Sequence, residues 1–231
     1  MAGPRSLGRR AFKLFYITYY KLLYGRRFPL ADRAERWVRD WEQETGRGDT
    51  PASKDTWEEQ YQKGGWEFMR RLDELPRYSV LAGYLRHLKP GGSVLDVGSG
   101  EGILRDEMRV HGYARWVGVD ISETAVARAR EVPDDRATFL AANAEEYRPA
   151  GRDDRFDAVV FNECVYYFED PLGTVERYRG FLEPGGVILV SMFRSRRADV
   201  IRDRLKAALP LREEVELRHR KGTWVVSVFG G

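Results

Sequence analysis

Short apolar runs alternate with amphipathic stretches along the second half of the chain. The apolar runs predict strands at residues 93–97, 115–120, 137–142, 156–162 and 187–193. Apolar positions at helical spacing predict helices from residue 103 and over 122–132, 170–182 and 197–208. Residues 216–219 and 224–229 flank a short turn and predict a closing hairpin. This alternation of strand and helix is typical of an α/β fold with a mostly parallel sheet.

The segment before the first strand has a different pattern, in which aromatic residues recur at helical spacing. The spacing predicts helices over residues 32–45, 66–75 and 76–88, with a loop at 46–53. Thr56 and Glu59 form a capping-box pattern that predicts a further helix, which carries Trp57 and Tyr61. We therefore expect a helical cap or lid at residues 32–92, followed by a core at 93–231.

The N-terminal arm, residues 1–31, carries an unusual charge. It holds seven of the 39 basic residues and none of the 36 acidic ones, so the other 200 residues have a net charge of −4. Within it, residues 11–24 form an apolar face opposite a basic face, which is too short and too charged to span a bilayer. Residues 5–27 are therefore expected to contact an anionic membrane surface, a second subunit or the rest of the chain. A transit peptide is a further alternative.

Composition excludes several kinds of site. The single cysteine, Cys164, excludes a disulfide framework and a multi-cysteine zinc site, and three scattered histidines make a histidine-rich metal site unexpected. We predict no metal. Because the 200 residues after the arm are mildly acidic, the basic pI of the whole chain does not indicate a surface that follows nucleic-acid phosphates.

A glycine-rich turn lies between the strand at 93–97 and the helix after it. The turn, Gly98 to Gly102, reads GSGEG, so bare backbone N–H groups can approach a ligand closely. The next strand ends in Asp120, 22 residues after Gly98, where an acid can accept both hydroxyls of a ribose. Asp96 lies two positions before Gly98, and an acid there suits a cationic ligand better than a pyrophosphate. The pattern predicts an adenosine site for a positively charged ligand.

The sequences VLDVGSGEG around Asp96 and VGVDIS around Asp120 resemble the first two motifs of class I S-adenosylmethionine-dependent methyltransferases. The EPGG sequence at 183–186 resembles this family's turn before its fifth strand. The resemblance covers residues 56–231. It implies a Rossmann-like seven-stranded α/β sheet, mostly parallel with an antiparallel C-terminal hairpin, with helices on both faces and an N-terminal helical cap. It also implies an enzyme that uses S-adenosylmethionine as its cofactor.

The motifs, together with the rule that ligands bind at the carboxyl ends of the strands, give the cofactor-binding candidates. The family commonly has an acid near Asn143, and the amide oxygen of an asparagine can accept the same hydrogen bond from the adenine. Aromatic residues before the first strand often cover the cofactor in this family, although core packing also explains them. The candidates are Tyr61, Trp66, Tyr78, Asp96, Gly98, Gly100, Gly102, Asp120, Ile121, Asn143, Ala144, Glu145 and Asn162.

The catalytic candidates, Glu163, Tyr166 and Tyr167, follow the strand at 156–162. Glu163 is the expected base if the acceptor must lose a proton, and the alternative is that it orders a loop while the tyrosines form the pocket wall. Arg194, Arg196 and Arg197 are candidates for binding an anionic acceptor, or belong to a solvated loop. His87 and His111 precede strands and are expected at the opposite edge of the sheet.

These features predict methyl transfer to an oxygen or nitrogen of a small molecule, such as a secondary metabolite, a sugar or a lipid-linked intermediate. The alternatives are an RNA or protein methyltransferase that docks its substrate through the basic arm, and a non-catalytic binding protein with the same fold. The sequence after the strand at 156–162 lacks the Asn/Asp-Pro-Pro-Tyr-type motif of enzymes that methylate base amines, so nucleic acid is not the expected partner. We expect a cytoplasmic protein involved in natural product biosynthesis, with peripheral membrane contact as an option.

Overall fold

The chain divides into two compact parts. The first comprises Met1–Thr50 with Arg218–Thr223, and the second comprises Pro51–Leu217 with Trp224–Gly231. The computed structural model describes residues 14, 15, 18, 30, 33, 34, 37, 53–151, 154–220 and 222–231. Most of the predicted arm, including most of the contact surface at 5–27, and most of the loop at 46–53 therefore lie outside the described residues.

In the first part, the described arm residues Leu14, Phe15, Thr18 and Leu30 are helical. The ring of Phe15 packs edge-on against Trp37 with the ring centroids 4.6 Å apart. Leu14 and Leu30 are exposed. One apolar arm residue is therefore covered by the helical segment that follows the arm.

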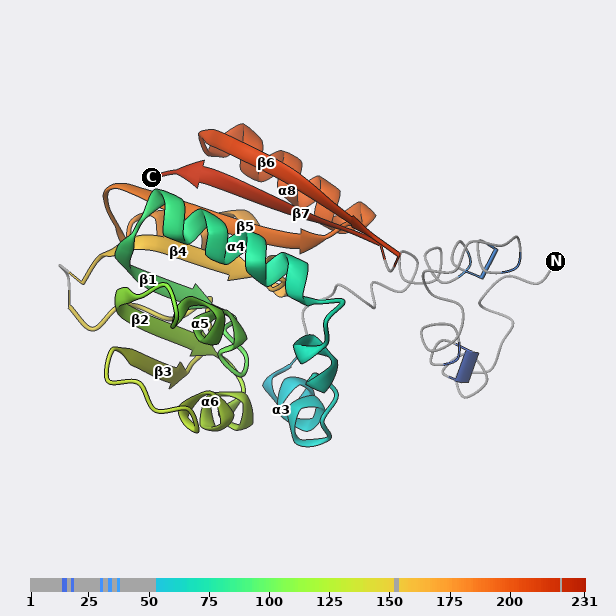
Figure 1. The fold of residues 1–231 in the computed structure, drawn as a ribbon. Helices are drawn as coiled ribbons and strands as arrows, with labels where there is room; N and C mark the ends of the chain where they lie inside the picture. The colour runs from blue at the N-terminus through green and yellow to red at the C-terminus, as the bar shows by residue number, and fades with distance from the viewer. Residues whose placement is uncertain are drawn as a thin grey trace. The chain divides into compact units, whose positions relative to one another are not determined.

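A seven-stranded sheet forms the centre of the second part (Figure 1). Its spatial order is β3-β2-β1-β4-β5-β7-β6. Strands β1 to β5 run parallel and β7 runs antiparallel to β5, as the sequence predicted for a Rossmann-like sheet with a C-terminal hairpin. The strands are β1 (Gly91–Val97), β2 (Tyr113–Asp120), β3 (Ala137–Ala141), β4 (Phe156–Asn162), β5 (Leu182–Phe193), β6 (Leu211–His219) and β7 (Gly222–Gly230).

Helices cover both faces of this sheet (Figure 1). One face is covered by α4 (Leu75–Leu88), α5 (Ile103–Met108) and α6 (Glu123–Arg130), which bury Leu81, Leu104 and Val126 against it. The other face is covered by α7 (Pro171–Arg179) and α8 (Arg196–Ala208), which bury Val175 and Ile201. The apolar strands are buried on both faces because each face has its own helical layer.

The shorter elements of the second part are α3 (Lys54–Gln62), the 3-10 helix η3 (Glu67–Arg70) and the 3-10 helix η4 (Val165–Tyr167). We call residues 53–70, which contain α3 and η3, the cap segment. By contrast, α4 buries Tyr78, Leu81 and Leu85 in the core, so the last helix of the region at 32–92 forms part of the core layer.

Some local elements differ from the prediction. Ser53 rather than Thr56 caps α3, and its side chain accepts a hydrogen bond from the Thr56 backbone N–H. The helix predicted over 66–75 is limited to η3, because Arg71 adopts an extended backbone. The EPGG sequence forms an irregularity inside β5. β6 is also longer than the predicted strand at 216–219. Within the described ranges, no helix is long and apolar enough to cross a membrane.

Candidate active site

The glycine-rich turn connects β1 to α5 at the carboxyl edge of the sheet, beside the point between β1 and β4 where the strand order reverses. Gly98, Gly100 and Gly102 have φ angles of 68°, 54° and 74°, in the left-handed region that favours glycine. A Cβ on Gly98 would lie 2.6 Å from the Cβ of Cys164, and one on Gly102 would lie 2.9 Å from the Cζ of Phe139. The glycines therefore permit the tight path of the turn itself.

Asp120 at the end of β2 fixes the turn to the neighbouring strand. Its Oδ2 accepts a hydrogen bond from the N–H of Gly100 at 2.8 Å, and its Oδ1 accepts one from the N–H of Ser122 at 2.9 Å. Burial raises the pKa of Asp120, and these backbone N–H groups oppose the rise. Each carboxylate oxygen retains a lone pair for a further donor such as a hydroxyl.

A small cavity of about 40 Å³ lies beside the glycine-rich turn. Seven of the predicted cofactor-binding residues line it, namely Tyr61, Trp66, Tyr78, Asp96, Gly98, Gly100 and Asn162. Its other lining residues are Met69, Ser99, Glu101, Ile103 and Leu104, which the sequence analysis did not select. Ser99 and Glu101 belong to the glycine-rich motif, which was the available signal, whereas Met69 has no sequence signal of its own.

Asp96 supplies a buried carboxylate to this cavity. It is 1% exposed, and neither oxygen has a hydrogen-bond partner among the described residues. Burial raises the pKa of Asp96 to about 7, the Asp120 carboxylate adds to the rise, and the Trp116 indole, close but outside hydrogen-bond geometry, opposes it. An unpaired buried carboxylate is costly, so this site favours a ligand that brings positive charge and N–H donors.

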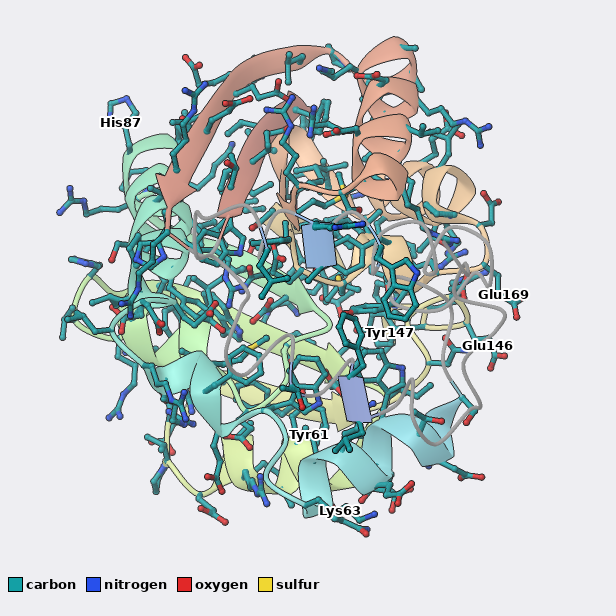
Figure 2. The ribbon with its side chains drawn as sticks, turned by 90° about the vertical axis from the view of Figure 1, so that its right-hand side faces the viewer. Tyr61, Lys63, His87, Glu146, Tyr147 and Glu169 are labelled. Atoms are coloured by element: carbon teal, nitrogen blue, oxygen red, sulfur yellow. The ribbon has the colours of Figure 1, made fainter. Side chains whose placement is uncertain are left out.

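Aromatic residues of the cap segment contact the glycine-rich turn directly. A Cβ on Gly100 would lie 2.9 Å from the hydroxyl of Tyr61, which is buried. Figure 2 shows Tyr61 near the middle of the view, between α3 and the sheet. Pockets that bury small ligands commonly have volumes of about 300–1,000 Å³. The cavity of about 40 Å³ is far smaller than such pockets.

Polar contacts attach the cap segment to the core. Glu58 accepts hydrogen bonds from the Ser122 hydroxyl at 2.8 Å and from the Thr124 N–H at 3.3 Å, at the start of α6. Hydrogen bonds from Thr124 and Ser122 lower the pKa of Glu58 to about 2. Arg70 of η3 pairs with Glu101 of the turn at 3.4 Å. These polar contacts attach α3 to the start of α6 and η3 to the glycine-rich turn.

The remaining predicted cofactor residues do not line the cavity. These are Gly102, Asp120, Ile121, Asn143, Ala144 and Glu145. The Asn143 amide oxygen accepts a hydrogen bond from the Glu145 N–H at 2.9 Å. The Glu145 carboxylate in turn accepts bonds from the N–H groups of Glu169 and Asp170, each at 3.1 Å. These residues shape the loop after β3, and the predicted adenine contact of Asn143 stays a prediction.

Glu163 follows β4 with a φ of 59°, in the left-handed region that a non-glycine residue rarely adopts. Its Oε2 accepts hydrogen bonds from the Tyr166 hydroxyl at 2.8 Å and the Phe193 N–H at 2.9 Å, and its Oε1 accepts one from the Ser191 hydroxyl at 2.7 Å. The guanidinium of Arg77 lies 4.0 Å away. Burial raises the pKa of Glu163, and Arg77 opposes the rise. This carboxylate joins α4, η4 and the end of β5.

The third catalytic candidate, Tyr167, belongs to a continuous series of aromatic rings. Its ring lies edge-on to Trp57 at 4.7 Å and 4.6 Å from the ring of Tyr166. Trp57 stacks on Trp66 at 5.6 Å, and Trp66 lines the cavity. Trp57, Trp66 and Tyr167 are half-buried. The rings therefore form a wall, called here the aromatic wall, that runs from the cavity to the predicted catalytic tyrosines.

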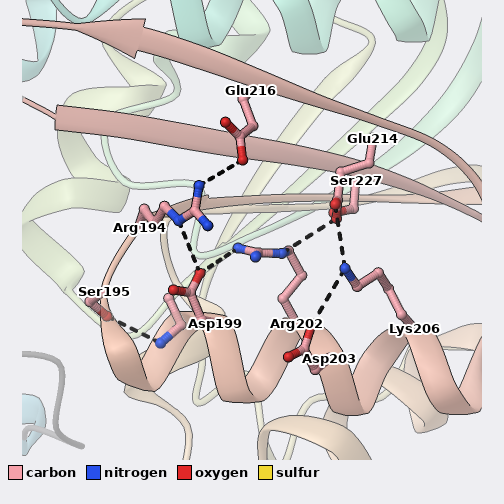
Figure 3. A network of polar contacts seen from close by, with 10 residues as sticks. Arg194, Ser195, Asp199, Arg202, Asp203, Lys206, Glu214, Glu216 and Ser227 are labelled. Atoms are coloured by element: carbon pink, nitrogen blue, oxygen red, sulfur yellow. Dashed lines mark hydrogen bonds and ion pairs between the residues drawn. The ribbon is translucent and has the colours of Figure 1, made fainter.

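The arginines considered for an anionic acceptor have partners of their own. Arg194 pairs with Glu216 at 2.7 Å and with Asp199 at 3.5 Å, within a network between α8 and the terminal hairpin (Figure 3). Arg197 donates a hydrogen bond to the Phe168 carbonyl at 3.4 Å, and the side chain of Arg196 lies outside the described residues. The contacts of Arg194 indicate a structural role.

Two histidines lie away from this site. His87 and His111 are exposed and precede β1 and β2, at the amino ends of the strands. In Figure 2, His87 projects outward at the periphery of the molecule. No group of His, Cys, Asp and Glu residues that could hold a metal ion occurs in the part of the chain that the structure describes.

Residues 66–225 match the family profile described as "Methyltransferase domain", which covers more than half of the chain. The chain belongs to the S-adenosylmethionine-dependent methyltransferases. Membership of this family confirms the fold class, the enzyme class and the cofactor that the motifs around Asp96 and Asp120 predicted.

Curated relatives of this methyltransferase have different acceptors in their names. It is 33% identical over 156 residues to the ribosomal protein L11 methyltransferase of Thermus thermophilus, covering 65% of this chain and 57% of the relative. It is 34% identical over 124 residues to the ubiquinone biosynthesis O-methyltransferase of Aromatoleum aromaticum, covering 52% and 49%. The chain spans about half the length of the curated relatives it matches.

Solved structures share the fold of this methyltransferase. The N-methyltransferase NodS of Bradyrhizobium japonicum with S-adenosylhomocysteine has a TM-score of 0.62 at 20% identity, over 72% of this chain and 91% of that one. A second structure is the 1,6-didemethyltoxoflavin-N1-methyltransferase of Burkholderia thailandensis, which holds 1,6-didemethyltoxoflavin and S-adenosylhomocysteine. Its TM-score is 0.62 at 20% identity. That match covers 77% of this chain and 86% of the other.

Residues of the cavity and of the end of β2 fit this cofactor chemically. The unpaired carboxylate of Asp96 suits the ammonium group of the cofactor's amino-acid end, and Asp120 retains lone pairs suited to ribose hydroxyls. Both groups lie on strands that flank the glycine-rich turn. The chain therefore has polar groups suited to both ends of the cofactor.

Proposed function

We propose that this methyltransferase transfers the methyl group of S-adenosylmethionine to an oxygen or nitrogen of a small-molecule acceptor, such as a secondary metabolite, a sugar or a lipid-linked intermediate. This proposal rests on the aromatic wall. Half-buried rings that continue from the cofactor cavity to Tyr167 provide a surface for a compact organic molecule. The solved methyltransferase that holds 1,6-didemethyltoxoflavin supports an acceptor of this size.

When bound, S-adenosylmethionine supplies an electrophilic methyl group on a sulfonium. The residues of this chain have to align the acceptor with that group and exclude water. In our proposal Trp57 and Tyr167 contact the acceptor, while Asp96, Asp120, Asn162 and the glycine-rich turn hold the cofactor.

The proposed role of Glu163 depends on its hydrogen bonds. Three donors already occupy the carboxylate, and it faces the guanidinium of Arg77. Only Oε1, which accepts a single hydrogen bond, keeps a lone pair for the proton of the acceptor, and the Glu163 side chain is buried. We therefore favour the alternative in which Glu163 orders the loop after β4 and thereby positions Tyr166 and Tyr167.

A product-detection screen with S-adenosylmethionine labelled in its methyl group tests the proposal. The panel contains phenols, amines, sugars and lipid-linked intermediates, and labelled product is identified by mass spectrometry. We expect label in at least one small molecule, with loss of product for Asp120→Ala and a raised acceptor KM for Trp57→Ala. Label that enters only RNA or protein would contradict the proposal.

The second candidate is methylation of RNA or protein, which the relative named as a ribosomal protein L11 methyltransferase favours. In this case the basic arm docks the substrate, so deletion of residues 1–31 should abolish turnover on RNA or peptide. Unchanged turnover of the shortened protein would rule out docking through the arm.

The N-terminal arm is also the basis for a proposal about where the protein is located in the cell. We propose a cytoplasmic protein whose residues 5–27 contact an anionic membrane surface or a second copy of the chain. Flotation with liposomes containing anionic lipid, and sedimentation of the full and arm-deleted proteins, measure the two contacts separately. Equal flotation and equal mass per particle for both proteins would remove these proposals.

A further inference from the structure

The cavity beside the glycine-rich turn concentrates buried polar atoms that lack a partner. Trp66 Nε1, both Asp96 carboxylate oxygens, Ser99 Oγ and Asn162 Oδ1 are buried without a hydrogen bond among the described residues, and all four residues line this cavity. Most buried polar groups in folded proteins are paired. Several unpaired groups around one cavity therefore indicate a ligand that supplies their partners.

The acceptors among these atoms define one part of the ligand. Asn162 Oδ1 is an acceptor and never a donor, and both Asp96 oxygens are acceptors alone when the carboxyl group is ionised. A primary ammonium group has three N–H donors and a positive charge, so it can satisfy acceptors of this kind together.

The unpaired donor defines a different part of the ligand. The indole Nε1–H of Trp66 only donates, so an ammonium group cannot be its partner. The Ser99 hydroxyl can donate as well. A negatively charged oxygen next to the ammonium would satisfy both. The set of unpaired atoms is thus complementary to a zwitterion, the α-amino and α-carboxylate groups of an amino acid.

Neighbouring rings restrict the position of the Trp66 indole. Trp57 stacks on it at 5.6 Å, Tyr61 lies at 6.1 Å, and Phe68 lies at 5.7 Å. Since these neighbours belong to the cap segment, the indole of Trp66 is held by that segment beside the cavity.

We propose that Trp66 Nε1, assisted by Ser99 Oγ, donates a hydrogen bond to the carboxylate of the cofactor's amino-acid end, opposite the ammonium bound by Asp96 and Asn162. This inference rests on the proposed function, since it concerns the same cofactor. It assigns a residue of the cap segment, which lies outside the glycine-rich motif, to cofactor recognition.

The test compares three ligands by calorimetry with the full chain. S-adenosylhomocysteine has both charged groups, its decarboxylated form keeps the amine alone, and 5′-methylthioadenosine lacks both. Because a hydrogen bond to a charged group is worth about 1.5–3 kcal/mol, Trp66→Phe should weaken S-adenosylhomocysteine binding by about 10-fold to 150-fold. The same variant should bind the other two ligands as the unsubstituted protein does. Ser99→Ala should give a smaller loss with the same selectivity.

Trp224→Phe is the matched control, because Trp224 is buried in β7 and does not line the cavity. It should bind all three ligands with unchanged affinity, and melting curves verify that each variant is folded. Equal losses for all three ligands with Trp66→Phe would show that the indole acts through packing alone and would overturn the inference. Unchanged affinity for S-adenosylhomocysteine would overturn it too. If the unsubstituted protein binds none of the ligands, the proposed function itself fails.

Discussion

The buried carboxylate of Asp96 predicts that cofactor affinity depends on pH. Its pKa is raised to about 7, so the free protein holds this group mostly protonated in mildly acidic solution. An ammonium group favours the ionised form, and binding therefore has to release the proton. Affinity should rise with pH until the carboxylate is ionised in the free protein.

The size of the effect follows from the ionised fraction. For a pKa of about 7, the fraction ionised is about 0.03 at pH 5.5 and about 0.5 at pH 7. A ligand that binds only the ionised form should therefore bind about 15-fold tighter at pH 7, a difference of about 1.6 kcal/mol. This range lies below the ordinary pKa of an α-amino group, about 7.7–8.0, so the ligand keeps its charge.

Calorimetric titration with S-adenosylhomocysteine measures both the affinity and the proton. Titration at pH 5.5 in two buffers of different ionisation enthalpy should report the release of about one proton per ligand. Asp96→Asn is the control, because it keeps the shape of the side chain and removes the titration. It should bind weakly, without pH dependence over this range. Equal pH dependence in the two proteins would refute the reasoning, since Asp120 or another group would then be responsible.

Asp96 should also lower the stability of the protein without ligand. The folded-state pKa lies above the unfolded value, so folding opposes ionisation, and stability falls as pH rises toward and through about 7. Once the pH is above about 7, the ionisation of Asp96 has lowered the free energy of unfolding by at most about 4 kcal/mol. Asp96→Asn should therefore melt at a higher temperature than the unsubstituted protein at pH 8, although it binds the cofactor less well. Identical melting temperatures would contradict this expectation.

Three further predictions concern other parts of the site and the fold. Glu163→Gln should keep turnover within about 10-fold with an unchanged pH profile, whereas loss of a base costs about 10²–10⁴-fold; kinetics decide between the two roles. Gly102→Ala should lower the free energy of unfolding by about 1–3 kcal/mol more than Gly112→Ala, measured in urea, because both have positive φ but only Gly102 would place a Cβ against Phe139. Arg202→Met should lower the free energy of unfolding more than Arg194→Met does (Figure 3). The reason is that the Arg202 side chain is 8% exposed and the Arg194 side chain 45%, so the loss for Arg194→Met should be less than about 1 kcal/mol. Similar melting temperatures for the last two would count against the network.

The sequence alone determined the family, the strand pattern and the cofactor motifs. These features are local, because apolar runs mark buried strands and glycine tolerates the positive φ angles of the turn after β1. The strand-end rule then selected Asp96, Asp120 and Asn162, since parallel strands place their carboxyl ends at one edge. Residues of the cap segment, such as Tyr61 and Trp66, were selected through the family resemblance.

Only the tertiary structure decided which of these groups are satisfied. No spacing in the sequence indicates that Glu163 meets Ser191, 28 positions away, or that Glu58 reaches Ser122, 64 positions away. Glu163 therefore looked like an available base, whereas packing surrounds its carboxylate with donors. Conversely, Asp96 and Trp66 have no partners within hydrogen-bond geometry, and that absence identifies the cofactor's amino-acid end as their ligand in our proposal. Hydrogen-bond satisfaction depends on contacts distant in sequence, so it emerges only when the chain is folded.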